Sequence, residues 1–101
     1  MTTRFIDEPQ TISIMHIREE RIRQDKKWGV QNHADLRWLP ILVEEVGELA
    51  KALNEGTMTG GELTQVAAVA LAWMECHERN RKASVDLPKV SPPDAPSGCR
   101  S

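Results

Sequence analysis

Three carboxylates lie within the apolar stretch ILVEEVGELAKAL, residues 41 to 53. Glu45 and Glu48 are three residues apart and therefore share one face of a helix, and Glu62 and Gln65 repeat this spacing further along the chain. Two carboxylates about 5 Å apart repel by about 3 kcal/mol at an effective dielectric constant of about 20, so converging acids need either protons or a cation. If the two segments are facing helices, these side chains can form a four-oxygen cage for a metal ion.

Hard oxygen ligands of this kind select magnesium, with manganese or calcium as alternatives. Glu44 and Glu48 also have a simpler interpretation, because both can be solvated side chains on the wet face of a helix. The motif EExxE therefore indicates a metal site only in combination with the second pair.

The second pair has its own alternative. The segment TGGE, residues 59–62, matches a capping box, in which Glu62 binds the backbone N–H of Thr59 and no metal. A symmetrical hairpin would also place Glu62 opposite Glu55, about two turns beyond Glu48. Only a skewed loop or crossing brings the two pairs together.

Three helices are expected to position these side chains. Apolar spacing and i,i+4 charge pairs predict a first helix over Thr11 to about Asp25. Residues 26–35 have no period and should form a long loop of the kind that often carries function. The second helix should run from about Leu36 to Asn54, and the third from Glu62 to about Arg81 after a turn at GTMTGG.

Asp35 is a candidate N-cap and Gly56 a candidate C-cap of the second helix. Pro40 suits the first turn best, so the ordered helix can begin later than Asp35 suggests. The residues expected to form the apolar stripes are Leu42, Val46, Leu49, Ala50 and Leu53 in the second helix and Leu63, Val66, Ala67, Ala70, Leu71 and Met74 in the third.

The chain has 101 residues, which fits one domain. Residues 1–83 should form an all-α domain, and residues 84–101 a proline-rich extended or disordered tail. About 80 residues give a thin core for a monomer. We therefore expect a homodimer that completes a helical bundle, with Val69 and Trp73 available for the interface and with further pairing into tetramers left open.

The bulk composition excludes several classes of function. The net charge of -2 with mixed signs gives no basic stripe, so nucleic acid is not expected as a partner. No apolar run approaches the ~20 residues that span a bilayer, and the N-terminus lacks the apolar region of a signal peptide. Cys76 and Cys99 resemble neither a disulfide framework nor a CxxC metal site, which fits a reducing cytosol. The expected location is cytoplasmic.

The sequence EEVGE, followed by 13 residues and ELTQ, resembles the EExxE and ExxD motifs of the MazG-like, all-α nucleoside triphosphate pyrophosphohydrolases. The resemblance extends to RQDKKWGVQNH and WLPILVEEVGELAKAL upstream and to VAAVALAWMEC downstream, which together cover roughly Ile17 to Arg79. The chain is most similar to the short, single-domain branch found among phage and mobile-element proteins.

This resemblance implies magnesium ligands at Glu45, Glu48 and Glu62, with manganese as an alternative ion. Gln65 stands where the family motif has Asp, so a dipole replaces a full charge; metal affinity should fall, or Gln65 touches nucleotide instead. Glu44, turned about 100° around the helix from Glu45, is placed to activate water or to hold a second ion.

The implied reaction is attack of water on the α-phosphorus of a (deoxy)nucleoside triphosphate, which releases nucleoside monophosphate and pyrophosphate as nucleotide-pool house-cleaning. The candidate substrate-binding residues are Lys27 (or Lys26) and Lys51 for phosphate, Trp28 and Trp38 for stacking on the base, and Asn32 and His33 for its edge. Simpler interpretations are surface charge for the lysines and packing for the tryptophans. The alternative function is a non-catalytic helical interaction module or nucleotide sensor with the same fold.

Overall fold

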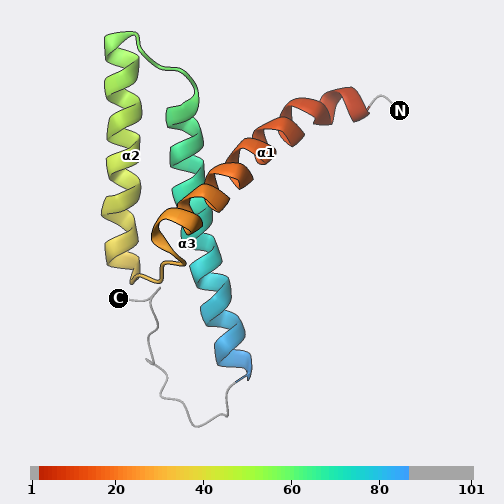
Figure 1. The fold of residues 1–101 in the computed structure, drawn as a ribbon, viewed down its shortest axis with the longest axis vertical. Helices are drawn as coiled ribbons and strands as arrows, with labels where there is room; N and C mark the ends of the chain where they lie inside the picture. The colour runs from red at the N-terminus through yellow and green to blue at the C-terminus, as the bar shows by residue number, and fades with distance from the viewer. Residues whose placement is uncertain (1–2, 87–101) are drawn as a thin grey trace.

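The computed structural model describes the backbone of residues 3–86 and the side chains of residues 8–83. This part of the chain forms three helices, α1 (Thr3–Trp28), α2 (Asp35–Glu55) and α3 (Gly61–Asp86), and contains no strand (Figure 1). The expected all-α class is therefore confirmed for the described residues. The predicted tail falls almost wholly outside them, since nothing beyond Asp86 is described.

Helix α3 is the central element. It runs antiparallel to α2 as a hairpin, and the C-terminal half of α1 crosses over it and packs against it, while the backbones of α1 and α2 do not come close to each other (Figure 1). The N-terminal half of α1 projects away from the hairpin, and its side chains Ile12, Ile14 and Met15 are exposed. A helix that projects in this way leaves apolar surface without an intramolecular partner.

The helix ends differ in detail from the prediction. Helix α1 begins before Thr11 and continues to Trp28, through residues expected in the loop; it stops at Gly29, whose φ of +75° a residue with a Cβ rarely adopts. Helix α2 begins at Asp35 and continues through Pro40, so it does not start late. Its N-cap is Ala34 rather than Asp35, and there is no side-chain capping bond.

Gly56 ends α2 as predicted. It adopts a left-handed conformation with φ of 70° and ψ of 23°, and its N–H donates to the carbonyl oxygen of Leu53. The next N–H, that of Thr57, donates to Ala52 at 2.8 Å. Two backbone carbonyls at the helix end are thereby satisfied, which is the arrangement that favours glycine after a helix.

The core lies between α2 and α3. Its buried residues are Trp38, Val69, Ala72 and Cys76, with Ile41, Leu42 and Trp73 partly buried around them. The indole rings of Trp38 and Trp73 stack at a centroid distance of 6.5 Å and an interplanar angle of 12°. Trp73 therefore packs within the subunit, and Val69, which was a candidate for a subunit interface, is buried in the core.

The predicted apolar stripes are only partly buried: Leu42 packs against the core, and Ala67, Ala70 and Leu71 are partly buried where α3 meets α1. On α2, Val46 and Leu53 are exposed, and on α3, Leu63 and Met74 are exposed. Helix α2 is rotated so that the face with Trp38 and Ile41 meets α3, and α3 turns its small residues toward α2. Ala68, Ala72 and Cys76 allow the two backbones to approach closely. This rotation places Glu45 on the inner face of α2.

Cys76 is disulfide-bonded in the structure, in contrast to the expectation from the cysteine pattern. None of the helices described is both long enough and apolar enough to cross a membrane.

Candidate functional site

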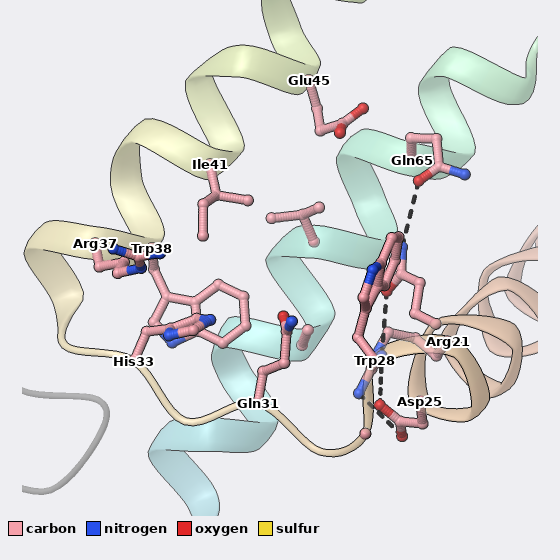
Figure 2. A pocket seen from close by; sticks show the side chains of 14 residues that line it. Arg21, Asp25, Trp28, Gln31, His33, Arg37, Trp38, Ile41, Glu45 and Gln65 are labelled. Carbon is pink, nitrogen blue, oxygen red and sulfur yellow. Dashed lines mark hydrogen bonds and ion pairs between the residues drawn. The ribbon is translucent and has the colours of Figure 1, made fainter.

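A cavity of about 280 Å³ opens between the C-terminal part of α1, the loop of residues 29–34, the start of α2 and the inner face of α3 (Figure 2). The candidate residues from the sequence that line it are Trp28, His33, Trp38, Glu45 and Gln65. Side chains far apart in the chain thus meet in one place. Glu44, Glu48, Glu62, Lys27, Asn32 and Lys51 do not line it.

Glu45 is the acid of this cavity. It extends from the inner face of α2 toward Gln65 on α3, and it is half-buried (Figure 2). Burial raises the pKa of the Glu45 carboxyl, and the negative charges of Glu44, Glu48 and Glu20 raise it further. A carboxylate in these surroundings gains from any cation that replaces the missing proton.

Glu62 adopts the capping-box arrangement. Its Oε1 accepts the backbone N–H of Thr59 at 3.1 Å and lies 3.4 Å from the Thr59 hydroxyl. The Thr59 N–H bond lowers the pKa of the Glu62 carboxyl. The carboxylate is therefore bound to the N-terminus of its own helix and does not line the cavity.

The four-residue cage is consequently not assembled in this conformation. Within residues 8–83 no cluster of three or more acidic, His or Cys side chains has a metal-binding arrangement. Glu45 and Gln65 line the same cavity and carry the oxygen donors that a hard divalent ion takes, whereas Glu48 is exposed outside it and Glu62 would have to exchange its Thr59 bond for the ion. A change of side-chain rotamer at Glu62 is thus a condition of the predicted site.

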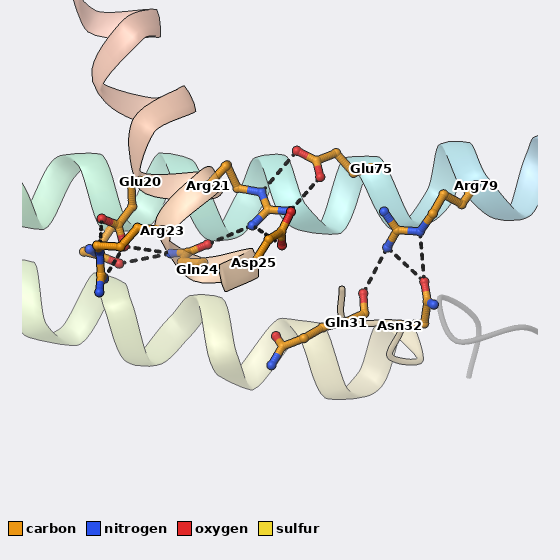
Figure 3. A network of polar contacts seen from close by, with 10 residues as sticks. Glu20, Arg21, Arg23, Gln24, Asp25, Gln31, Asn32, Glu75 and Arg79 are labelled. Carbon is orange, nitrogen blue, oxygen red and sulfur yellow. Dashed lines mark hydrogen bonds and ion pairs between the residues drawn. The ribbon is translucent and has the colours of Figure 1, made fainter. Parts of the chain in front are cut away.

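Gln65 is held by a polar network from α1. Gln24 Nε2 donates to Gln65 Oε1 at 3.3 Å, and Gln24 Oε1 accepts from Arg21 at 3.1 Å. Arg21 in turn binds both carboxylate oxygens of Glu75 on α3, at 3.1 and 2.6 Å (Figure 3). Because Arg21 and Gln24 are buried, this network fixes the oxygen of Gln65, the atom that would face a metal.

Glu20 is a second acid close to this position that the sequence analysis did not select. It accepts a hydrogen bond from Gln24 at 3.2 Å and a two-point contact from Arg23, and these bonds lower the pKa of its carboxyl, with Arg23 as the main cause. The nearby Gln65 amide lowers the pKa of this carboxyl as well. No local sequence pattern marks Glu20, because its approach to Gln65 depends on how α1 crosses α3.

The other end of the cavity contains His33 and Arg37. The imidazole of His33 packs edge-on against Trp38 at 4.9 Å, and burial followed by the nearby Arg37 charge lowers the His33 pKa, so the ring is neutral at pH 7. Arg37 lines the cavity, and no side chain of the described residues pairs with its guanidinium. Arg37 was not predicted, although it lies two turns before Glu45 on one face of α2.

The two tryptophans have different environments. Trp28 is 55% exposed at the cavity wall, and the Lys27 ammonium lies 4.8 Å from its ring centroid. Trp38 is only 2% exposed and forms the floor of the cavity, so it has no open face on which a base could stack. The simpler interpretation of packing holds for Trp38, and Trp28 is the stacking candidate.

Asn32 lies on the loop but turns to α3, where its Oδ1 accepts two bonds from Arg79 (Figure 3). Lys51 and Glu44 are exposed on α2 outside the cavity. Asn32, a candidate for a base-edge contact, is therefore turned away from the cavity, whereas its neighbours Gln31 and His33 line it.

No protein family model matches this chain, and no curated protein or solved structure matches it either. The functional assignment accordingly depends on the motif pattern and on the geometry of the cavity.

Proposed function

We propose that this protein is a magnesium-dependent pyrophosphohydrolase of (deoxy)nucleoside triphosphates with a MazG-like fold. The observation that carries the proposal is that Glu45, Gln65, Trp28 and His33 line one cavity, together with Arg37, whose guanidinium has no side-chain partner among the described residues. One end of the cavity contains a desolvated acid, and the other end contains an aromatic face with neutral and cationic donors. This arrangement suits a molecule that has both a polyphosphate and a base.

In this proposal, different residues of the cavity contact different parts of the ligand. Trp28 stacks on the base, and His33 and Gln31 contact its edge with neutral donors and acceptors. Arg37 supplies the charge that attracts the anionic ligand into the cavity. The buried network behind Gln65 keeps that side chain in place while the ligand enters.

A bound magnesium ion, held by Glu45, Glu48, Gln65 and a rotated Glu62, would neutralise phosphate charge during hydrolysis. Without a cation, the pKa of the Glu45 carboxyl is raised. Binding of an ion would therefore be coupled to the ionisation of this carboxyl group. Glu44, one residue before it and exposed, remains the candidate for positioning water or a second ion.

The second candidate function is a non-catalytic nucleotide sensor or interaction module with the same fold. Two observations favour it: Gln65 replaces a charged ligand, and Glu62 is bound to Thr59. Such a protein would bind nucleotide in the same cavity and release no pyrophosphate.

We also propose that the subunit pairs as a homodimer. On the outer face of α2, Leu39, Val43, Val46 and Leu53 are all exposed and recur at spacings of four, three and seven residues. A stripe with this period fits a second helix, and a second copy of the chain offers an identical stripe. Val46→Lys should shift the mass measured by light scattering toward the monomer, whereas Val30→Lys in the loop should not.

The enzymatic proposal is tested by measuring pyrophosphate release from a panel of deoxynucleoside triphosphates with magnesium. Turnover of at least one substrate is expected, and Glu48→Gln should abolish it while the helical circular dichroism stays the same. Glu55→Gln, an exposed acid in the last turn of the same helix, is the matched control and should stay active. Nucleotide binding without pyrophosphate release would favour the sensor.

A further inference from the structure

The loop of residues 29–34 is held by a residue outside the cavity. Arg79 of α3 donates from Nε to Asn32 Oδ1 at 3.2 Å, and from Nη2 to the same oxygen at 2.9 Å and to the backbone carbonyl of Gln31 at 3.0 Å (Figure 3). One planar guanidinium thus fixes both a side chain and the main chain at adjacent loop residues.

The residues on either side of Asn32 face the cavity, whereas Asn32 faces Arg79. Gln31 and His33 line the cavity, whereas Asn32 and Arg79 do not. The Arg79 contacts therefore act on the loop from outside the cavity, and the loop presents its neighbouring side chains to the cavity. His33 keeps its edge contact with Trp38 only while the loop backbone holds this course.

Within the part of the chain that the structure describes, few other contacts restrain the loop. The N–H of Gly29 donates to the carbonyl of Asp25 at one end, and those of Arg37 and Trp38 donate to Ala34 at the other. Between these ends, the Cys76 sulfur lies 3.5 Å from Asn32 Oδ1 and 3.8 Å from the carbonyl oxygen of His33, which makes it a packing contact. The Arg79 guanidinium supplies the strong bonds in the middle of the loop.

We propose that Arg79 is a positioning residue for the nucleotide site, which acts by holding the 29–34 loop so that Gln31 and His33 meet the ligand. This inference rests on the proposed function, because it assigns the loop to ligand binding. A loop that is already ordered does not have to lose conformational freedom when the ligand binds, so removal of the guanidinium should weaken binding without touching the ligand.

The test compares Arg79→Ala with Arg81→Ala in the full-length chain. Arg81 lies two residues further along α3 and forms an exposed i,i+3 pair with Glu78, so its loss removes the same charge and leaves the loop untouched. Three quantities are measured: backbone hydrogen exchange in residues 29–34, the Kd for magnesium and an α,β-imido deoxynucleoside triphosphate, and kcat and KM for the best substrate of the panel.

For Arg79→Ala we expect exchange in the loop to rise about tenfold, Kd and KM to rise about tenfold, and kcat to change much less. Arg81→Ala should match the wild type in all three. An unchanged loop exchange, or faster exchange with an unchanged Kd, would overturn the positioning role. If the wild type binds no nucleotide, the proposed function fails with it, and the exchange measurement still shows separately whether Arg79 holds the loop.

Discussion

The carboxylate of Glu62 binds the backbone N–H of Thr59 at 3.1 Å, and this bond decides which of two roles the side chain has in the ligand-free state. As a cap, Glu62 stabilises the start of α3. As a metal ligand, it would have to turn toward α2. The two roles compete for one carboxylate, so magnesium binding and capping should be coupled.

Substitutions at Glu62 should separate these roles. Glu62→Gln keeps an acceptor for the Thr59 N–H and loses the charge, so stability should change little while magnesium-dependent turnover falls at least tenfold. Glu62→Ala should lower both the stability and the magnesium-dependent turnover. Chemical denaturation and an activity titration with magnesium measure the two effects. If Glu62→Gln keeps full activity at low magnesium, Glu62 is a cap and not a ligand.

Sequence patterns located the helices better than their faces. The regular spacing of Leu42, Val46 and Leu53 predicted the buried side of α2, yet Val46 and Leu53 are exposed. An apolar stripe shows that a helix has an apolar side, but not which of two apolar sides meets its neighbour. The buried face of α2 is determined by its fit to α3, where the small side chains of Ala68 and Ala72 permit close packing of the two helices.

The candidate site was also predictable only in part, because the sequence does not show which helix faces meet. Glu45, Trp28 and His33 were selected from residue type and motif, and the fold brings them to one cavity. Arg37 and Glu20 were not selected, because their relevance depends on the rotation of α2 and on the crossing of α1 over α3. Tertiary geometry of this kind leaves no local pattern in the sequence.

Replacing Gln65 should change the requirement for magnesium. Gln65→Glu keeps the length of the side chain and its bond from Gln24, and adds a full negative charge, as in the ExxD motif that the sequence resembles. The magnesium concentration for half-maximal activity should fall about threefold to tenfold. Gln10→Glu is the control, since it adds the same charge at an exposed position of α1 that does not line the cavity. An unchanged requirement in Gln65→Glu would place Gln65 outside the coordination shell.

The contact between Arg21 and Glu75 should be a main link between α1 and α3. Arg21 is buried and binds both oxygens of Glu75, so Arg21→Met should destabilise the protein by about 2–3 kcal/mol; this lies below the range for fully buried pairs because the Glu75 side chain is 35% exposed. Urea denaturation measures the change. Arg23→Met removes an exposed arginine of the same helix and should have a much smaller effect. Equal losses in the two variants would contradict a special role for Arg21.

The raised pKa of Glu45 leads to a prediction on pH. A carboxyl group whose pKa is higher in the folded than in the unfolded state destabilises the fold once it ionises, so the free protein should gain stability as the pH falls through the folded pKa. Glu45→Gln removes this ionisation. It should therefore raise the Tm at pH 7.5 without magnesium, and the gain should disappear under acidic conditions, where Glu45 is protonated in the wild type as well.

With magnesium at pH 7.5 the wild type should have the higher Tm, because only the wild-type carboxylate binds the ion. Glu44→Gln, an exposed neighbour, is the control, and a Tm gain in Glu45→Gln that persists at low pH would show that the effect does not come from ionisation.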